Sequence, residues 1–299
     1  MLTKLLIFIE KYKVEYHSYA LLRSVLALST LLTIIINPID TLFPIFIDSN
    51  EVVYSKLTLF DFNISYFVFR NIVLFKTISI LILFLVIYGA YPRITGVLHF
   101  IVTCLFFNTS IAIDGGDQIS SNLTFLLIPL TLLDNNTNHW RYKKKIKLLF
   151  NKVIFYSFSF VITLQISMVY LHSAIAKLTV NEWLDGTANW YWFRHEIFGA
   201  NYFILDIVNF SLKNPYILYC LNYSVIILEI LIAMMLFVDK NKYLPKLVFI
   251  FAIIFHIGIV FIHGIFSFAL TMVGCLLFYF KKKVSYPSIE LRKTSKQKA

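Results

Sequence analysis

The strongest constraint on this sequence is a series of apolar runs, several of them long enough to cross a lipid bilayer. A helix needs about 20 mostly apolar residues to span the hydrocarbon core. Such runs recur along the whole chain, and 59% of its 299 residues are hydrophobic, with a mean hydropathy of +0.76. This composition excludes a soluble domain with an ordinary polar surface. We therefore predict an all-α, polytopic transmembrane helical bundle.

The pattern predicts about eight spans separated by polar turns. Their ranges are 19–36, 72–91, 94–113, 122–133 (counted from 119), 153–176, 216–238, 247–261 and 266–280. Two further segments are expected at the membrane surface: the basic amphipathic stretch 1–18 and the moderately apolar stretch 197–212, which is interfacial or re-entrant. We expect one transmembrane domain over residues 1–280, followed by a basic cytoplasmic tail at 281–299.

The basic residues predict an orientation rather than a nucleic-acid partner. The formal net charge is +11, and the basic residues cluster in short loops between apolar runs. If the N-terminus is cytoplasmic, the basic loops at 141–152 and 240–246 and the tail all lie inside. We therefore predict a multi-pass protein of a bacterial plasma membrane, in contact with lipid, with both termini in the cytoplasm.

Most familiar site motifs are missing from the sequence. It has no Walker A, GxGxxG or GxSxG pattern, and its seven histidines show no HExxH or HxxxH spacing. We predict no metal site. Cys104, Cys220 and Cys275 lie in or beside apolar runs without CxxC spacing, so we expect buried thiols.

One stretch, YLHSAIAKLTVNEWLDGTANWYWF at 170–193, carries more polar chemistry than a span needs. Lys177 and His172 lie where an apolar run ends, so both are ionisable groups at an apolar boundary. A partly desolvated lysine can give up its proton and serve as a general base. We predict that Lys177 and His172 are catalytic. The alternative is a snorkelling lysine followed by an aromatic belt.

On the predicted topology, several other polar residues share the outer face with Lys177. We expect them to bind substrate in an outward-open cavity lined by helices. They are Asp114, Asp117, Gln118, Glu182, Trp183, Asp185 and His263.

Glu229 is an acidic residue near the middle of a predicted span, where a charge is costly. We predict that it pairs with His256, at a comparable depth in the next span. A neutral Glu229 bonded to a backbone carbonyl is the alternative. His99 is expected to be a core histidine whose hydrogen bonds are satisfied. His17, His139 and His195 are expected to be solvated or interfacial.

Four segments together resemble a known family. They are LLRSVLALSTLLT, DGGDQ, HSAIAKLTVNEWLDGTA and FHIGIVFIHGIFSFALTMVG. In this order they resemble the sporulation-delaying protein B family, bacterial members of the HTTM group (horizontally transferred transmembrane domain). That group is similar to the membrane part of vitamin K-dependent gamma-carboxylase. The resemblance covers nearly all of the chain except the tail, so 1–280 would be an HTTM-like domain.

The resemblance implies a role in peptide toxin maturation. Family members are implicated in maturing a small secreted antimicrobial peptide from its precursor, together with a sporulation-delaying protein A-like partner. In the carboxylase, the lysine of a similar motif deprotonates reduced vitamin K, and Lys177 in AKLTVNEW occupies that position. The cofactor, if any, is left open.

Three functions remain open from the sequence. The protein is a maturation enzyme or its membrane subunit, or a scaffold that presents the precursor to a protease. The third is a transporter or immunity protein in which Glu229 and His256 relay protons. Lys177→Ala separates the first two, and Glu229→Gln tests the third.

Overall fold

The computed structural model describes residues 16–43, 58–59, 62–63, 68–141, 146–196 and 199–281. The predicted surface segment 1–18 and the tail 281–299 lie almost wholly outside these residues. The described part is helical, apart from a two-residue strand β1 (Thr58–Leu59) that pairs antiparallel with β2 (Phe62–Asn63). The predicted all-helical class is confirmed.

The helix boundaries follow the apolar runs closely. In chain order the helices are α2 (Tyr16–Ile36), α3 (Ile39–Leu42), α5 (Ile72–Tyr88), α6 (Pro92–Thr109), α7 (Gly115–Leu133), α8 (Leu149–Lys177), α9 (Asn181–Leu184), α10 (Ala188–Trp192), α11 (Tyr202–Leu212), α12 (Pro215–Met234), the 3-10 turn η1 (Met235–Phe237), α13 (Tyr243–His263) and α14 (Phe266–Tyr279).

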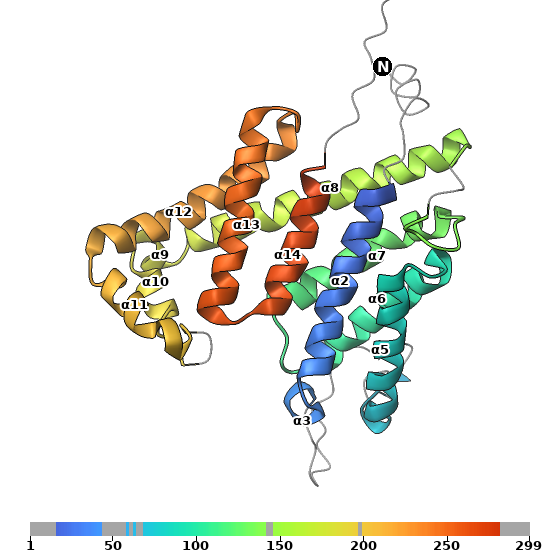
Figure 1. Cartoon of the computed structure of the whole chain (residues 1–299), viewed down its shortest axis with the longest axis horizontal. Helices are drawn as coiled ribbons and strands as arrows, with labels where there is room; N and C mark the ends of the chain where they lie inside the picture. The colour runs from blue at the N-terminus through green and yellow to red at the C-terminus, as the bar shows by residue number, and fades with distance from the viewer. Residues whose placement is uncertain are drawn as a thin grey trace, which may run out of the picture.

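Helix α2 lies at the centre of a bundle formed by α2, α5, α6, α7 and α14. It packs against α14, α5 and α7, so the first and last described helices lie side by side (Figure 1). Helix α6 packs on α7 and α5. Helix α8 has 29 residues and is about 43 Å long at 1.5 Å per residue. It packs against α7 of this bundle and against α12. Helix α13 joins α12 to α14, and the short helices α9 to α11 lie beyond the end of α8 (Figure 1).

Four helices are long and apolar enough to cross a membrane. They are α2, α8, α12 with η1 (Pro215–Phe237), and α13. The other predicted spans are also helices, but α5 has only 17 residues and α14 only 14. A membrane protein is therefore supported, whereas a count of eight spans remains a prediction.

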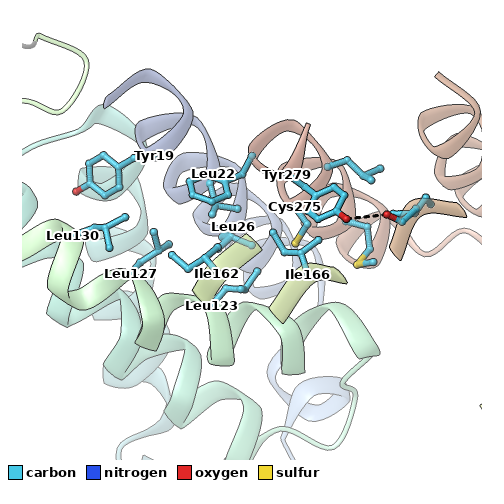
Figure 2. Packing of buried hydrophobic residues seen from close by; sticks show 14 of the residues in the cluster. Tyr19, Leu22, Leu26, Leu123, Leu127, Leu130, Ile162, Ile166, Cys275 and Tyr279 are labelled. Carbon is cyan, nitrogen blue, oxygen red and sulfur yellow. Dashed lines mark hydrogen bonds between the residues drawn. The ribbon is translucent and has the colours of Figure 1, made fainter. Parts of the chain in front are cut away.

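The main hydrophobic core lies where α2, α7, α8 and α14 meet (Figure 2). Leu22 and Leu26 of α2 are fully buried with Leu123 of α7 and Ile162 of α8. The Tyr279 hydroxyl at the end of α14 donates to the backbone oxygens of Ile232 (2.9 Å) and Ala233 (3.1 Å). Those bonds fix the end of α12 to the core.

A tight turn positions α5 against α6. Gly89 ends α5 with φ +88°, a left-handed conformation that glycine adopts without steric cost, and Pro92 begins α6 at its first turn. Gly96 faces Thr131 of α7 so closely that a Cβ atom would overlap the threonine side chain. The small residue allows α6 and α7 to approach closely.

Candidate functional site

A closed triangle of polar side chains forms at the end of α8. The Lys177 ammonium lies 2.8 Å from Oε1 and 2.9 Å from Oε2 of Glu229 on α12. It also donates to the Ser173 hydroxyl at 2.7 Å, and that hydroxyl donates to Glu229 Oε1 at 3.0 Å. Each member therefore contacts both of the others.

The local sequence explains the triangle. Ser173 and Lys177 are four residues apart on one helix, a spacing that places two side chains on the same face. Lys177 is the last residue of α8, where the helix dipole favours a positive charge. The three N–H groups of an ammonium have three acceptors here, Ser173 Oγ and both Glu229 oxygens, so the arrangement suits a protonated lysine.

The site is buried on the Glu229 side and open on the Lys177 side. The Glu229 side chain is 6% exposed and the Lys177 side chain 18%. The Lys177 Nζ atom lies 5.3 Å from the centre of the Trp183 ring, within the range of a cation–π contact. A molecule arriving from outside would meet Lys177 and Trp183 before Glu229.

Helix α12 holds the loop that carries Trp183. Asn222 Nδ2 donates to the Trp183 carbonyl at 3.0 Å, and the Tyr223 hydroxyl donates to the Leu184 carbonyl at 2.7 Å. Gly186, with φ +82°, lies so close to the Tyr219 ring that a Cβ atom would collide with it. The loop is thus bonded to the same helix that supplies Glu229.

The structure pairs Glu229 with Lys177 rather than with His256. The His256 ring is buried and donates from Nδ1 to the Ala252 carbonyl at 2.7 Å, and its Nε2 accepts a long 3.4 Å bond from the Tyr170 hydroxyl. Among the described residues, no hydrogen bond links Glu229 to a backbone carbonyl, which was the alternative. The long lysine side chain reaches back from the end of α8 to the carboxylate. The prediction compared only the depth of Glu229 and His256 in the membrane, so it did not consider this lysine.

The two aspartates of the DGGDQ turn have a structural arrangement of their own. Asp114 Oδ1 accepts from the backbone N–H groups of Gly116 and Asp117, and Asp117 Oδ2 accepts from the Asp114 N–H, which is a reciprocal cap on α7. Asp114 Oδ2 also accepts a 2.5 Å bond from the Ser267 hydroxyl at the start of α14. Among the described residues, no hydrogen bond or ion pair links this turn to Lys177.

The remaining predicted site residues are not members of the triangle. His172, Gln118 and Glu182 are exposed, and Asp185 closes a local turn by accepting from the N–H (2.9 Å) and hydroxyl (2.6 Å) of Thr187. The His263 ring lies edge-on against Phe193, with 5.4 Å between centroids. The expected cavity shared by all of these residues remains a prediction.

Sequence reasoning missed a second buried polar cluster, in the first half of α2. The Arg23 side chain is fully buried and donates to His139 Nδ1 at 2.9 Å and to the Thr95 hydroxyl. His139 was expected to be solvated or interfacial, but its exposure is 0%. Burial, reinforced by the Arg23 charge, lowers the pKa of His139 to about 3. The basic residues that follow His139 in the sequence suggested an exposed segment, but the loop that carries His139 folds back onto Arg23.

The cysteine and histidine predictions have mixed outcomes. All three thiols are free, but only Cys275 is buried; Cys104 is half-buried and Cys220 is exposed on α12. His99 is buried as predicted, but the expectation that its hydrogen bonds are satisfied is wrong for Nε2, which has no partner among the described residues. Within the described ranges, no three His, Cys, Asp or Glu side chains are placed to hold a metal ion.

Comparison with known proteins assigns the chain to a family. It is 35% identical over 277 residues to the sporulation-delaying protein SdpB of Bacillus subtilis strain 168, covering 91% of this chain and 83% of that protein. The chain belongs to the SdpB family. A second relative from the same organism, the uncharacterized protein YitO, is 35% identical over 264 residues, which is 87% of this chain and 84% of YitO. No family model matches the chain. No solved structure matches it either.

The family assignment confirms the resemblance to the sporulation-delaying protein B family, whereas the HTTM and gamma-carboxylase likeness remains a prediction. In this SdpB-family protein, Ser173, Lys177 and Glu229 combine a hydroxyl, an amine and a carboxylate at hydrogen-bond distance. Such a set can accept a proton, donate one and stabilise a negative charge. Ser173 was not among the predicted site residues, although its position four residues before Lys177 was visible in the sequence.

Proposed function

We propose that this SdpB-family protein helps to convert a small secreted precursor into an active peptide toxin at the outer face of the bacterial plasma membrane. The observation that carries the proposal is the Ser173–Lys177–Glu229 triangle, which is more than a membrane anchor requires. An anchoring lysine would extend toward lipid headgroups. Lys177 instead turns back to a buried carboxylate.

In this proposal the chain crosses the membrane eight times and both termini are cytoplasmic. The start of α2, the α12–α13 connection and the end of α14 lie at one end of the bundle in Figure 1, and the α13–α14 turn lies at the other. The proposal places the end with the start of α2 in the cytoplasm, because the basic loops lie there and basic loops favour the cytoplasmic side. Lys177 then lies toward the outer side, where a secreted precursor is accessible.

The proposed chemistry is a proton transfer within the Lys177–Glu229 pair. When Lys177 passes a proton to Glu229, a neutral amine and a neutral acid remain at the same 2.8 Å contact. The amine can then accept a proton from a reacting group, and the acid can return one. The gamma-carboxylase likeness supports the same assignment of Lys177 as the base, and no cofactor is assigned.

Two partners complete the proposal, a sporulation-delaying protein A-like protein and membrane lipid. Helix α11 supports the lipid contact, because Tyr202 and Phe203 at its start are 85% and 87% exposed and Leu212 is its one buried residue. An apolar helix with so little protein contact suits a membrane interface. We propose the same interfacial position for it that the sequence predicts.

Lys177→Arg is the decisive test. Arginine keeps the positive charge but holds its proton too firmly to act as a base. The cells carry the native chain, Lys177→Arg, or the matched control Lys213→Arg. Lys213 is exposed and, in the proposed topology, lies on the same side of the membrane as Lys177. The measurements are the secreted mature peptide, by mass spectrometry, and the amount of protein in the membrane. We expect maturation to fail with Lys177→Arg only. Normal maturation by that variant would leave Lys177 as an anchor and favour the scaffold function.

A further inference from the structure

We infer that Ser173 is a nucleophile, and that the triangle cleaves an amide bond of the precursor through an acyl-serine intermediate. The inference rests on the proposed function and names its reaction. No hydroxyl was expected at this site from the sequence, and the structure assigns one to it. The substrate class is a peptide that reaches the outer membrane surface.

The distances match what nucleophilic catalysis needs. A nucleophile and its base lie at about 2.6–3.2 Å, and a third group orients the base. Ser173 Oγ lies 2.7 Å from Lys177 Nζ, and Lys177 in turn lies 2.8 Å from Glu229. Ser173 therefore occupies the nucleophile position, Lys177 the base position and Glu229 the orienting position. Pairs of serine and lysine serve this role on unrelated folds.

The reaction balances without any oxidant or metal. Lys177 first passes a proton to Glu229, and the free amine takes the proton of Ser173 Oγ as that oxygen bonds to the substrate carbonyl carbon. The proton then moves to the leaving nitrogen, the C–N bond breaks, and an ester on Ser173 remains. Water attacks this ester and gives a proton to Lys177, the bond between the acyl carbon and Ser173 Oγ breaks, and Lys177 passes that proton to Oγ. Glu229 then returns its proton to Lys177, which restores the starting state. The products are one carboxylic acid and one amine.

The surroundings of the triangle fit a peptide substrate. Ser173 and Lys177 are both partly exposed, so a peptide bond can reach the hydroxyl. Asn222 lies seven residues before Glu229, on the same face of α12. Its Nδ2 holds the Trp183 loop, while its buried Oδ1 has no hydrogen-bond partner in the structure. Asn222 is fully buried, so it holds the loop beside the triangle rather than contacting a substrate.

A second serine on the same helix shows what a structural serine looks like. Ser167 is buried, and its hydroxyl donates to the Ala233 carbonyl at 3.0 Å. Among the residues that the structure describes, no hydrogen bond joins it to a lysine. Ser167 therefore serves as a matched control on the same helix, because it offers the same side chain without a base.

The test combines covalent labelling with maturation, using the full chain in its native membrane. Membranes are treated with an alkyl fluorophosphonate, which phosphonylates an activated serine, and the labelled peptide is identified by mass spectrometry. The variants are Ser173→Ala, Ser173→Cys, Ser167→Ala and Lys177→Arg. We expect label on Ser173 in the native chain and in Ser167→Ala, and none in Lys177→Arg. Secreted mature peptide should fall by about 10³-fold or more in Ser173→Ala.

Each outcome decides between the two proposals. If Ser173→Ala matures the precursor normally while Lys177→Arg fails, the nucleophile is wrong and the proposed function stands. If both variants mature it normally, the proposed catalytic function fails as well. If Ser173→Ala fails but the native Ser173 takes no label, Ser173 only positions Lys177. Should Ser173→Ala not reach the membrane, Ser173→Cys replaces it: maturation that becomes sensitive to N-ethylmaleimide, relative to the native chain, supports the nucleophile, and insensitive maturation overturns it.

Discussion

His139 Nδ1 accepts a 2.9 Å hydrogen bond from the Arg23 guanidinium at a place where neither side chain is exposed. This bond fixes the tautomer of the histidine, because Nδ1 must carry a lone pair. The proton therefore sits on Nε2, which donates to the Ser24 hydroxyl at 3.2 Å. A neutral histidine thus joins the 134–141 loop to α2.

The first prediction is that this histidine makes stability fall in acid. The folded-state pKa of His139 is lowered to about 3, whereas an unfolded histidine titrates near 6.5. Between these values the unfolded chain binds a proton that the folded chain does not. Stability is therefore complete above about pH 6.5 and falls toward pH 3, by up to about 1.4 kcal/mol per pH unit. Thermal unfolding in detergent at several pH values measures the slope.

The histidine variants separate this effect from general acid sensitivity. His139→Gln should flatten the pH dependence, whereas His17→Gln, at an exposed position, should leave it unchanged. Equal slopes for the two variants would show that His139 is not responsible.

The second prediction concerns the turn between α5 and α6. Gly89 has φ +88°, and a Cβ atom there would lie 2.6 Å from the His139 ring and 2.9 Å from the Trp140 ring. Gly89→Ala should therefore lower the melting temperature by an amount equivalent to about 1–3 kcal/mol. Gly258→Ala is the matched control, because no atom lies within 4 Å of a Cβ at that position. An unchanged melting temperature in Gly89→Ala would show that the turn accommodates the added methyl group.

The third prediction is energetic coupling between Lys177 and Glu229. Removing one partner leaves the other polar group buried or half-buried without compensation, so Lys177→Met and Glu229→Gln should each destabilise by about 3 kcal/mol or more. The double variant should be more stable than the sum of the two predicts, by about 1–3 kcal/mol. Unfolding of the four proteins in detergent gives this coupling. If the effects of the two single substitutions simply add in the double variant, the ion pair contributes nothing to the free energy of unfolding.

The fourth prediction is the orientation of the chain. In a Cys220→Ser background, which removes the exposed thiol, single cysteines replace Asp185 and Lys147. An impermeant thiol reagent applied to intact cells should label position 185 and not position 147. The reverse pattern would invert the topology and place Lys177 on the cytoplasmic side.

The sequence predicts the helices well because their signals are local. The apolar run from Ile72 sets the start of α5. Helix α7 begins at Gly115, four residues before the predicted span, because Asp114 caps it and draws the DGGDQ turn into the helix. Side-chain partners depend on the rotation of one helix against another, which no local pattern encodes. Depth in the bilayer suggested His256 for Glu229, yet the packing of α8 on α12 brings Lys177 there. The burial of His139 likewise depends on a distant arginine.

The loop over Lys177 is held through its main chain. Asn222 and Tyr223 bind the carbonyl oxygens of Trp183 and Leu184, and these bonds do not depend on which side chains those residues carry. The identity of the exposed side chains at positions 182 and 184 is therefore separable from the placement of the ammonium group. Substitutions at these two positions can therefore change the surface that an incoming molecule meets while Lys177 and Glu229 keep their places.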